Sequence, residues 1–171
     1  MKKKTVIENF LNEIYILKHI IRYNTVPKIS HESVAEHSFF VTAIVLELHK
    51  YYDFDLEKAL TMAVVHDFCE THISDVPRNV KNKYARLKDV LAEVESGVWK
   101  DIYPEYAPLV EELEARVTVE AKIVNLADLL SVMQYSRSEV KLGNEGYMKC
   151  VFEESSALIS SRFKEIKDFK K

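Results

Sequence analysis

Glycine is scarce in this sequence: 171 residues contain 3 glycines, where an average usage of about 7% would give roughly twelve. Proline is nearly as scarce, with 4 residues. Hairpin-rich β folds need glycine at turns with positive φ, so few such turns can form here. The glycine-rich loops that bind phosphates in Rossmann and P-loop proteins are also absent, which excludes nucleotide binding through such a loop. The composition therefore predicts an all-α fold.

Cysteine is scarce as well, and the sequence has neither a long apolar run nor a strong net charge. Cys69 and Cys150 form no C-x-x-C pair, so neither a disulfide framework nor a zinc knuckle is indicated. No apolar run approaches the roughly 18 residues of a membrane span, and the first residues contain no signal-peptide region. We therefore expect a cytoplasmic protein with no membrane partner. The net charge of -3 gives no overall attraction to nucleic-acid phosphates, and the basic run Arg78–Lys88 is expected to be a solvated helix face, so no nucleic-acid partner is expected.

Apolar residues at helical spacing, together with helix-start signals, predict six or seven helices. No heptad pattern persists, so an irregular bundle is expected rather than a coiled coil. No linker rich in proline, glycine or serine divides the chain, which predicts one domain over residues 1–171. The expected helices cover about residues 6–21, 34–51 after a capping box at Ser33, 55 to before Pro77, 83–100, 105–116, 118–143 and 145 onward.

Ionisable residues interrupt three of the predicted apolar faces. His37 lies within the stripe of the second helix, His66 and Asp67 follow the stripe of the third, and Asp128 shares the apolar face of the long late helix. A buried unpaired carboxylate costs several kcal/mol. Each residue alone has an ordinary structural explanation, but two imidazoles and two carboxylates from three helices form a plausible ligand set for a divalent metal ion. Four protein ligands leave octahedral positions open for water and a substrate oxygen.

The sequence around these residues is more specific than a histidine–aspartate pair alone. It resembles the YfbR-like 5′-deoxynucleotidases, and the related phage dATP triphosphohydrolases, over about residues 8–150. These are HD-domain metal phosphohydrolases, so the resemblance implies an all-α HD-domain fold and hydrolysis of deoxynucleotide phosphate esters. It also implies a homo-oligomer, a dimer or larger. The matching segments are Ile21–Thr25, Val34–Ser38, His66–Glu70, Asp75–Pro77 and Asn125–Asp128.

The resemblance also assigns residue roles. It implies one divalent metal ion held by His37, His66, Asp67 and Asp128. The residue types leave Mn, Co, Fe, Mg, Ni and Zn all open as the native metal. The resemblance further implies Glu70 and Asp67 as catalytic residues, with Glu70 acting on either the water or the leaving group. For substrate binding it implies Arg22 and Lys81 near the phosphate, Asp75 near the sugar, and Tyr23 in a position where the bacterial enzymes usually have a stacking tryptophan.

The expected reaction is the hydrolysis of a deoxynucleoside 5′-monophosphate, a small-molecule substrate, to deoxynucleoside and phosphate. An alternative is dNTP triphosphohydrolysis, with dATP as the example, which releases deoxynucleoside and triphosphate. A weaker alternative is a catalytically silent HD scaffold that binds a nucleotide or a protein.

Overall fold

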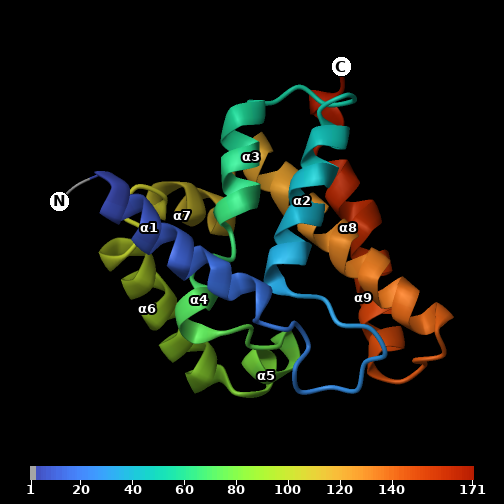
Figure 1. Cartoon of the computed structure of the whole chain (residues 1–171). Helices are drawn as coiled ribbons and strands as arrows, with labels where there is room; N and C mark the ends of the chain where they lie inside the picture. The colour runs from blue at the N-terminus through green and yellow to red at the C-terminus, as the bar shows by residue number, and fades with distance from the viewer. Residues whose placement is uncertain (1–2) are drawn as a thin grey trace.

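The helices of the protein form an irregular bundle around α2, α3 and α8 (Figure 1). The computed structural model describes residues 3–171, apart from the side chains at positions 78, 79 and 82. The Arg78 side chain of the basic run and residues 1–2 of the predicted domain therefore lie outside the described part. The prediction of one domain over the whole chain stays a prediction.

Residues 3–171 contain helices and no strand, apart from two isolated β-bridges. Seven of the helices have nine residues or more, as expected, and α4 and α5 are shorter. The all-α prediction is confirmed. The elements are α1 (Lys3–Ile14), η1 (Tyr15–Lys18), α2 (Val34–Leu48), α3 (Leu56–Val65), α4 (Glu70–Ile73), α5 (Arg78–Lys83), α6 (Ala85–Asp101), α7 (Ala107–Ala115), α8 (Val119–Lys141), α9 (Tyr147–Glu165) and η2 (Lys167–Phe169), where η marks a 3₁₀ helix.

Side-chain caps fix where the helices of the site begin. The Ser33 hydroxyl accepts a hydrogen bond from the Glu36 N–H at 3.2 Å, and the Glu36 carboxylate accepts one from the Ser33 N–H at 2.7 Å. This capping box satisfies backbone N–H groups that the first turn of α2 leaves free. At α3 and α8 only the N-cap side chain acts: Asp55 accepts a hydrogen bond from the Lys58 N–H, and Thr118 accepts one from the Ala121 N–H. The predicted starts of these three helices are thus confirmed.

The third predicted helix was expected to run to just before Pro77, and here the structure differs. α3 ends at Val65, and residues 66–69 form a turn before α4 begins. Within it the Phe68 N–H donates to Val65 O at 2.9 Å and the Glu70 N–H to Asp67 O at 3.0 Å. These are hydrogen bonds between residues three apart, which tighten the chain relative to an α-helix. The first helix is also shorter than expected, because η1 replaces its last turns.

Two apolar clusters form the core, and the second of them includes Phe68 and Cys69 of the turn at residues 66–69. Buried residues of α2, α3, α7 and α8 form the first cluster, and the second joins η1, the start of α2, the turn, α6 and α7. The turn is therefore packed into the core through Phe68 and Cys69. Representative members are Val41, Val45, Met62, Val124 and Leu126 in the first cluster and Leu17, Val34, Phe68, Trp99 and Val110 in the second.

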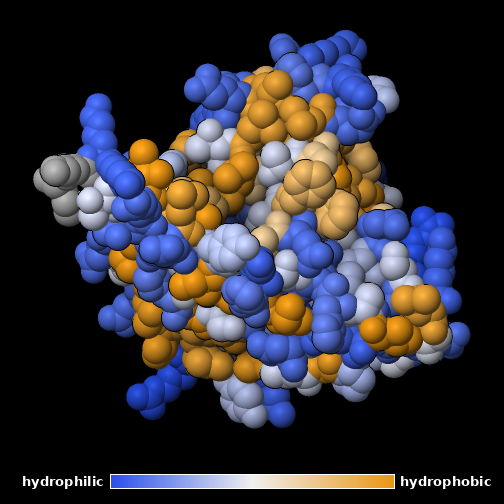
Figure 2. All heavy atoms as spheres, viewed as in Figure 1, coloured by the Kyte–Doolittle hydropathy of each residue, from blue (hydrophilic) through white to orange (hydrophobic). Residues whose placement is uncertain are grey.

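Apolar side chains also gather on the surface, over α1, α2 and α3 (Figure 2). Among the apolar residues of these three helices, Phe39 is the most exposed, with 68% of its surface accessible. Among the described residues, no helix is both long and apolar enough to cross a bilayer. The exposed apolar residues of these three helices include Val6, Ile7, Leu11, Phe39, Phe40, Leu46 and Val64.

Candidate active site

A cavity of about 700 Å³ opens between the 22–23 segment, the turn at residues 66–69, α8 and α9. Eight of the nine residues that the sequence singled out line it. The ninth, His37, is fully buried in α2 and lies behind the lining residues. The eight are Arg22, Tyr23, His66, Asp67, Glu70, Asp75, Lys81 and Asp128.

The four residues predicted as metal ligands come together at one side of the cavity. Ligand atoms of His37, His66 and Asp128 all lie within 4.8 Å of one another. Asp67 is outside that closest group, but its Oδ2 lies 3.1 Å from His66 Nε2 and 4.0 Å from His37 Nε2. Asp128 Oδ1 in turn lies 3.1 Å from His37 Nε2. Two imidazoles and two carboxylates therefore point toward one small volume.

The orientation of both imidazole rings fits a metal ion. The Nδ1 of His66 donates to the Ala63 carbonyl at 2.8 Å, and the Nδ1 of His37 lies 3.1 Å from the Ser131 hydroxyl. Both Nε2 atoms are buried without a hydrogen-bond partner. A histidine ligand commonly holds its second nitrogen in this way, which leaves the lone pair of the first for the metal.

The charges of the cluster act strongly on one another. Burial would raise the pKa of Asp67 and Asp128, but the neighbouring histidines and Arg22 lower both pKa values below their ordinary range. Both carboxyl groups are therefore ionised at neutral pH. Burial, with Arg22 adding to it, lowers the pKa of His37, whereas at His66 the Asp67 carboxylate outweighs burial and raises the pKa. A divalent cation among these groups would balance the two carboxylates, as their burial requires.

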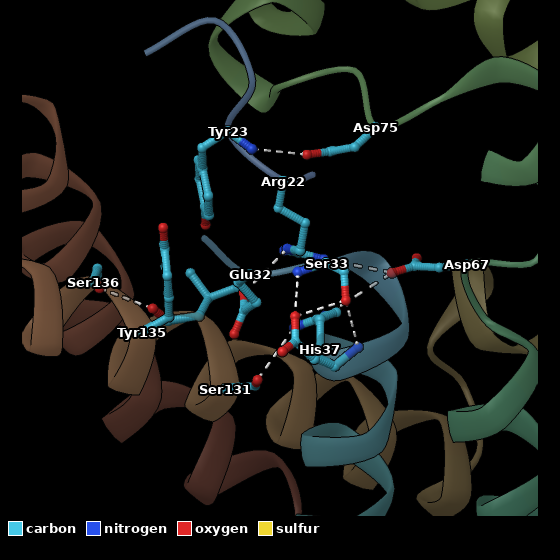
Figure 3. A network of polar contacts seen from close by, with 12 residues as sticks. Arg22, Tyr23, Glu32, Ser33, His37, Asp67, Asp75, Ser131, Tyr135 and Ser136 are labelled. Carbon is cyan, nitrogen blue, oxygen red and sulfur yellow. Dashed lines mark hydrogen bonds and ion pairs between the residues drawn. The ribbon is translucent and has the colours of Figure 1, made fainter. Parts of the chain in front are cut away.

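Arg22 lies at the centre of the polar network beside this cluster (Figure 3). Its Nη1 is 3.5 Å from Asp67 Oδ2, and its Nε is 3.5 Å from Glu32 Oε2. Burial would lower the pKa of Arg22, but the nearby carboxylates, with Asp67 first, raise it above its ordinary value. The guanidinium is thus a permanent cation that faces the cavity.

Tyr23 and Asp75 form the next part of the wall. The Tyr23 N–H donates to Asp75 Oδ2 at 3.1 Å. Tyr23 has a φ of 54°, and Ser74, next to Asp75, has a φ of 64°. Such left-handed conformations are unusual for residues with a side chain and often occur at functional sites. The Tyr23 ring stacks on Tyr135, with 5.5 Å between centroids and 7° between planes (Figure 3), and the guanidinium carbon of Arg22 lies 5.7 Å from the centroid of the same ring.

Glu70 and Lys81 face the same cavity from α4 and α5. The Oε2 atom of Glu70 is buried and has no hydrogen-bond partner. Burial, together with the charges of Asp67 and Asp75, raises the pKa of Glu70 to about 9. The Lys81 ammonium donates to Glu95 Oε1 at 3.1 Å. A carboxyl group with a raised pKa and a lysine therefore line the same cavity as His66, Asp67 and Asp128.

The sequence did not point to the wall that α9 contributes. Its side chains are mostly ordinary apolar or polar types, and none belongs to a recognisable motif. Lys88 also lines the cavity, although the basic run that contains it was expected to be a solvated face. The α9 residues of the wall are Tyr147, Cys150, Val151, Glu154, Ser155 and Leu158.

Known proteins share this sequence pattern. The model of the family described as 5′-deoxynucleotidase YfbR-like matches residues 9–171. The chain belongs to the YfbR-like 5′-deoxynucleotidase family. As a member of that family it is a phosphohydrolase of the HD type, which confirms the expected family, fold and enzyme class. The 5′-deoxynucleotidase PM0747 of Pasteurella multocida is 24% identical over an alignment 145 residues long, and the match covers 77% of this chain and 74% of that protein.

Solved structures share the fold of this family member. An HD-domain phosphohydrolase of Listeria innocua has a TM-score of 0.76 at 26% identity, over 94% of this chain and 82% of that one. The HD phosphohydrolase DatZ of cyanophage S-2L, solved with dA and a catalytic Zn²⁺ ion, has a TM-score of 0.68 at 22% identity, over 91% of this chain and 84% of that one. The likeness to DatZ concerns the fold alone.

Proposed function

We propose that this family member hydrolyses deoxynucleoside 5′-monophosphates to deoxynucleoside and phosphate. The observation that carries the proposal is the convergence of the histidine and aspartate cluster, Arg22 and Glu70 on one cavity of about 700 Å³. A cavity of that size is within the range of small-ligand sites. The name of the relative PM0747, a 5′-deoxynucleotidase, supports the same substrate class.

His37, His66, Asp67 and Asp128 would hold one divalent metal ion. The two Nε2 atoms without hydrogen-bond partners and the two ionised carboxylates supply the mixed nitrogen and oxygen donors that Mn, Co, Fe, Mg, Ni and Zn accept. When bound, such an ion polarises the phosphate and makes water more acidic. Asp67 is the residue with a double role, because it also contacts Arg22.

Arg22 and Glu70 carry the remaining chemistry. The Arg22 guanidinium would bind the phosphate oxygens by charge-assisted hydrogen bonds. In the reaction the oxygen of water bonds to phosphorus, the bond from phosphorus to the 5′-oxygen breaks, and one proton passes from water to that oxygen. Because its pKa is raised, Glu70 is suited to donate a proton to the departing 5′-oxygen and to regain one from the attacking water.

Asp75, Tyr23 and Lys81 would position the rest of the substrate. Asp75 Oδ2 accepts from the Tyr23 N–H, which leaves Oδ1 to accept a hydrogen bond from the 3′-hydroxyl of a deoxyribose. Tyr23 lines the cavity next to the Arg22 guanidinium, and its ring would stack on the base or sugar. Lys81 lines the cavity beside the phosphate-binding side and would add positive charge there.

A second candidate reaction is the hydrolysis of a dNTP to deoxynucleoside and triphosphate. The observation that favours it is the presence of Lys88 in the cavity wall together with Lys81. Lys88, and Lys81 if it exchanges Glu95 for a phosphate oxygen, would add positive charge for a longer polyphosphate.

A substrate screen tests both reactions. The purified protein, loaded with each divalent metal in turn, is incubated with dAMP, dGMP, dTMP and dATP, and with AMP as the ribonucleotide control. Release of inorganic phosphate from the monophosphates supports the main proposal, and release of triphosphate from dATP supports the second. A metal-loaded, folded protein that cleaves none of the substrates would contradict both.

A cytoplasmic location and a homo-oligomer belong to the same proposal. Cys69 and Cys150 are both free thiols, which a reducing compartment preserves. The exposed apolar residues of α1, α2 and α3 would be covered in a dimer or larger assembly. Light scattering at micromolar concentration measures the mass directly, and the mass of a single chain would contradict the assembly.

A further inference from the structure

Arg22 is joined through its backbone to the segment that precedes α2. The Arg22 N–H donates to Glu32 O at 2.9 Å, and the Val34 N–H donates to Ile20 O at 3.0 Å. Ile21 and Ser33 form an antiparallel β-bridge between these two hydrogen bonds. Arg22 and Glu32 are therefore fixed opposite each other before any side-chain contact is considered.

The two side chains extend this pairing into the protein interior. Arg22 Nε lies 3.5 Å from Glu32 Oε2, and the side chains are only 12% and 8% exposed. On its other side the guanidinium contacts Asp67 through Nη1. The group is thus held between two carboxylates, as Figure 3 shows. Neither contact uses Nη2, so N–H donors of the guanidinium are left to bind a ligand.

The contacts of the Glu32 side chain do not explain why this carboxyl group is buried. It does not line the cavity, and its Oε2 has no hydrogen bond. Burial raises the pKa of Glu32 to about 7 in spite of the Arg22 charge beside it. Buried ion pairs stabilise a fold weakly and can often be replaced by apolar residues without loss. A buried carboxylate with an unsatisfied oxygen therefore needs another explanation.

We propose that Glu32 is a positioning residue, which holds the Arg22 guanidinium in the orientation that receives the substrate phosphate. The inference rests on the proposed function, because that function gives Arg22 its phosphate. Without the Glu32 charge, Asp67 would be the remaining acidic contact of the Arg22 guanidinium. The guanidinium would therefore turn toward the metal-ligand cluster. Phosphate binding would weaken, while the four metal ligands would keep their own contacts.

The substitution Glu32→Gln, compared with the wild type at pH 8, where a carboxyl with a pKa of about 7 is mostly ionised, tests this role because it removes the charge and keeps the size. The probe is inorganic phosphate, titrated by calorimetry into the Mn²⁺-loaded full chain. We expect its Kd to rise roughly ten- to hundredfold, the range found when partners that orient a ligating side chain are removed. KM for dAMP should rise with it, kcat should change less, and bound Mn²⁺ should stay at the wild-type level.

A double-mutant cycle with Arg22→Gln separates positioning from general damage to the fold. If Glu32 acts through Arg22, adding E32Q to R22Q should change the phosphate Kd by less than about twofold. A Kd that rises by the same factor in both backgrounds would overturn the proposal, and so would an unchanged Kd in E32Q alone.

Glu36→Gln is the matched control. Glu36 lies four residues further on and accepts hydrogen bonds from Ser33 in the capping box, and no ion pair joins it to Arg22. E36Q should lower the thermal stability and leave the phosphate Kd within about twofold of the wild type. If it weakens phosphate binding as much as E32Q does, the effect belongs to the start of α2 and the proposal fails. If the wild type binds phosphate but cleaves no nucleotide, only the proposed function fails.

Discussion

Glu139 offers the most quantitative test of how the site is held together. It is fully buried in α8 and accepts hydrogen bonds from the N–H of Ile29 and of Ser30 at 2.7 Å, from the Ser30 hydroxyl at 2.5 Å and from the Asn144 amide at 3.0 Å. The Tyr135 hydroxyl donates to the Ser30 carbonyl at 2.8 Å. Glu139 therefore anchors the segment that connects Tyr23 to α2.

The magnitude follows from the pKa of this carboxyl group. Burial would raise the pKa of Glu139, but the Ser30 hydroxyl, the Ile29 N–H and the Asn144 amide bring it from 4.5 down to about 2. Because one pH unit of pKa difference is worth about 1.4 kcal/mol, the carboxylate contributes about 3 kcal/mol to stability at neutral pH. A group with a lowered folded-state pKa gives this stability above its unfolded pKa and loses it as the pH falls. Less than about half of it should remain at pH 3.

The assay is urea unfolding of Glu139→Gln and wild type between pH 7 and pH 3. In either orientation the new amide places an NH₂ group against N–H or O–H donors, so E139Q should be less stable by about 3 kcal/mol at pH 7. That difference should shrink toward pH 3. Glu145→Gln is the control, since its ion pair with Lys149 is exposed and should be worth less than about 0.5 kcal/mol. A loss in E139Q below that level at pH 7, or a loss independent of pH, would refute the reasoning.

Four further predictions concern the metal and the chemistry. Asp128→Ala should lower metal affinity by more than about a hundredfold, since losing an outer partner alone costs about 10- to 100-fold; elemental analysis of the purified protein measures this. Ser131→Ala, which removes the partner of His37 Nδ1, should weaken metal binding about 10- to 100-fold, whereas Ser136→Ala, whose hydroxyl bonds within α8, should not. Glu70→Gln should lower kcat by about 10²- to 10⁴-fold with phosphate affinity retained, and equal kcat values would exclude Glu70 as the proton donor. EDTA should abolish activity and added Mn²⁺ restore it; activity that survives complete metal removal would contradict the metal site.

The predicted metal ligands could be found because metal chemistry requires residue types that rarely lie on apolar helix faces. Glu70 and the substrate-binding residues were indicated by the family resemblance and not by such a pattern. His37 stands out within its stripe, and the structure places it there at full burial. The break between α3 and α4 could not be predicted in the same way. Residues 66–69 contain neither glycine nor proline. Their turn depends on Phe68 and Cys69, which pack into the second apolar cluster while His66 and Asp67 face the cavity.

The residues of α9 that line the cavity were not predicted, for a different reason, although the sequence contains a signal for one of them. Gly143, with a φ of 101°, follows the end of α8, and α9 then runs back beside α8 (Figure 1). Asp128 lies 15 residues before this glycine and Leu158 lies 15 residues after it. Two helices that reverse at Gly143 bring such positions to the same level, so counting from the turn would have indicated Leu158. Side-chain chemistry alone gives no such indication.

The cavity joins an arginine near the beginning of the sequence to a helix near its end. Arg22 and Leu158 line the same space, with 135 residues between them. During translation, which proceeds at about 5–20 residues per second, the ribosome must therefore complete and release nearly all of this sequence before the walls can meet. Nascent chains arrested before α9 should be inactive even where α2, α3 and α8 have already folded.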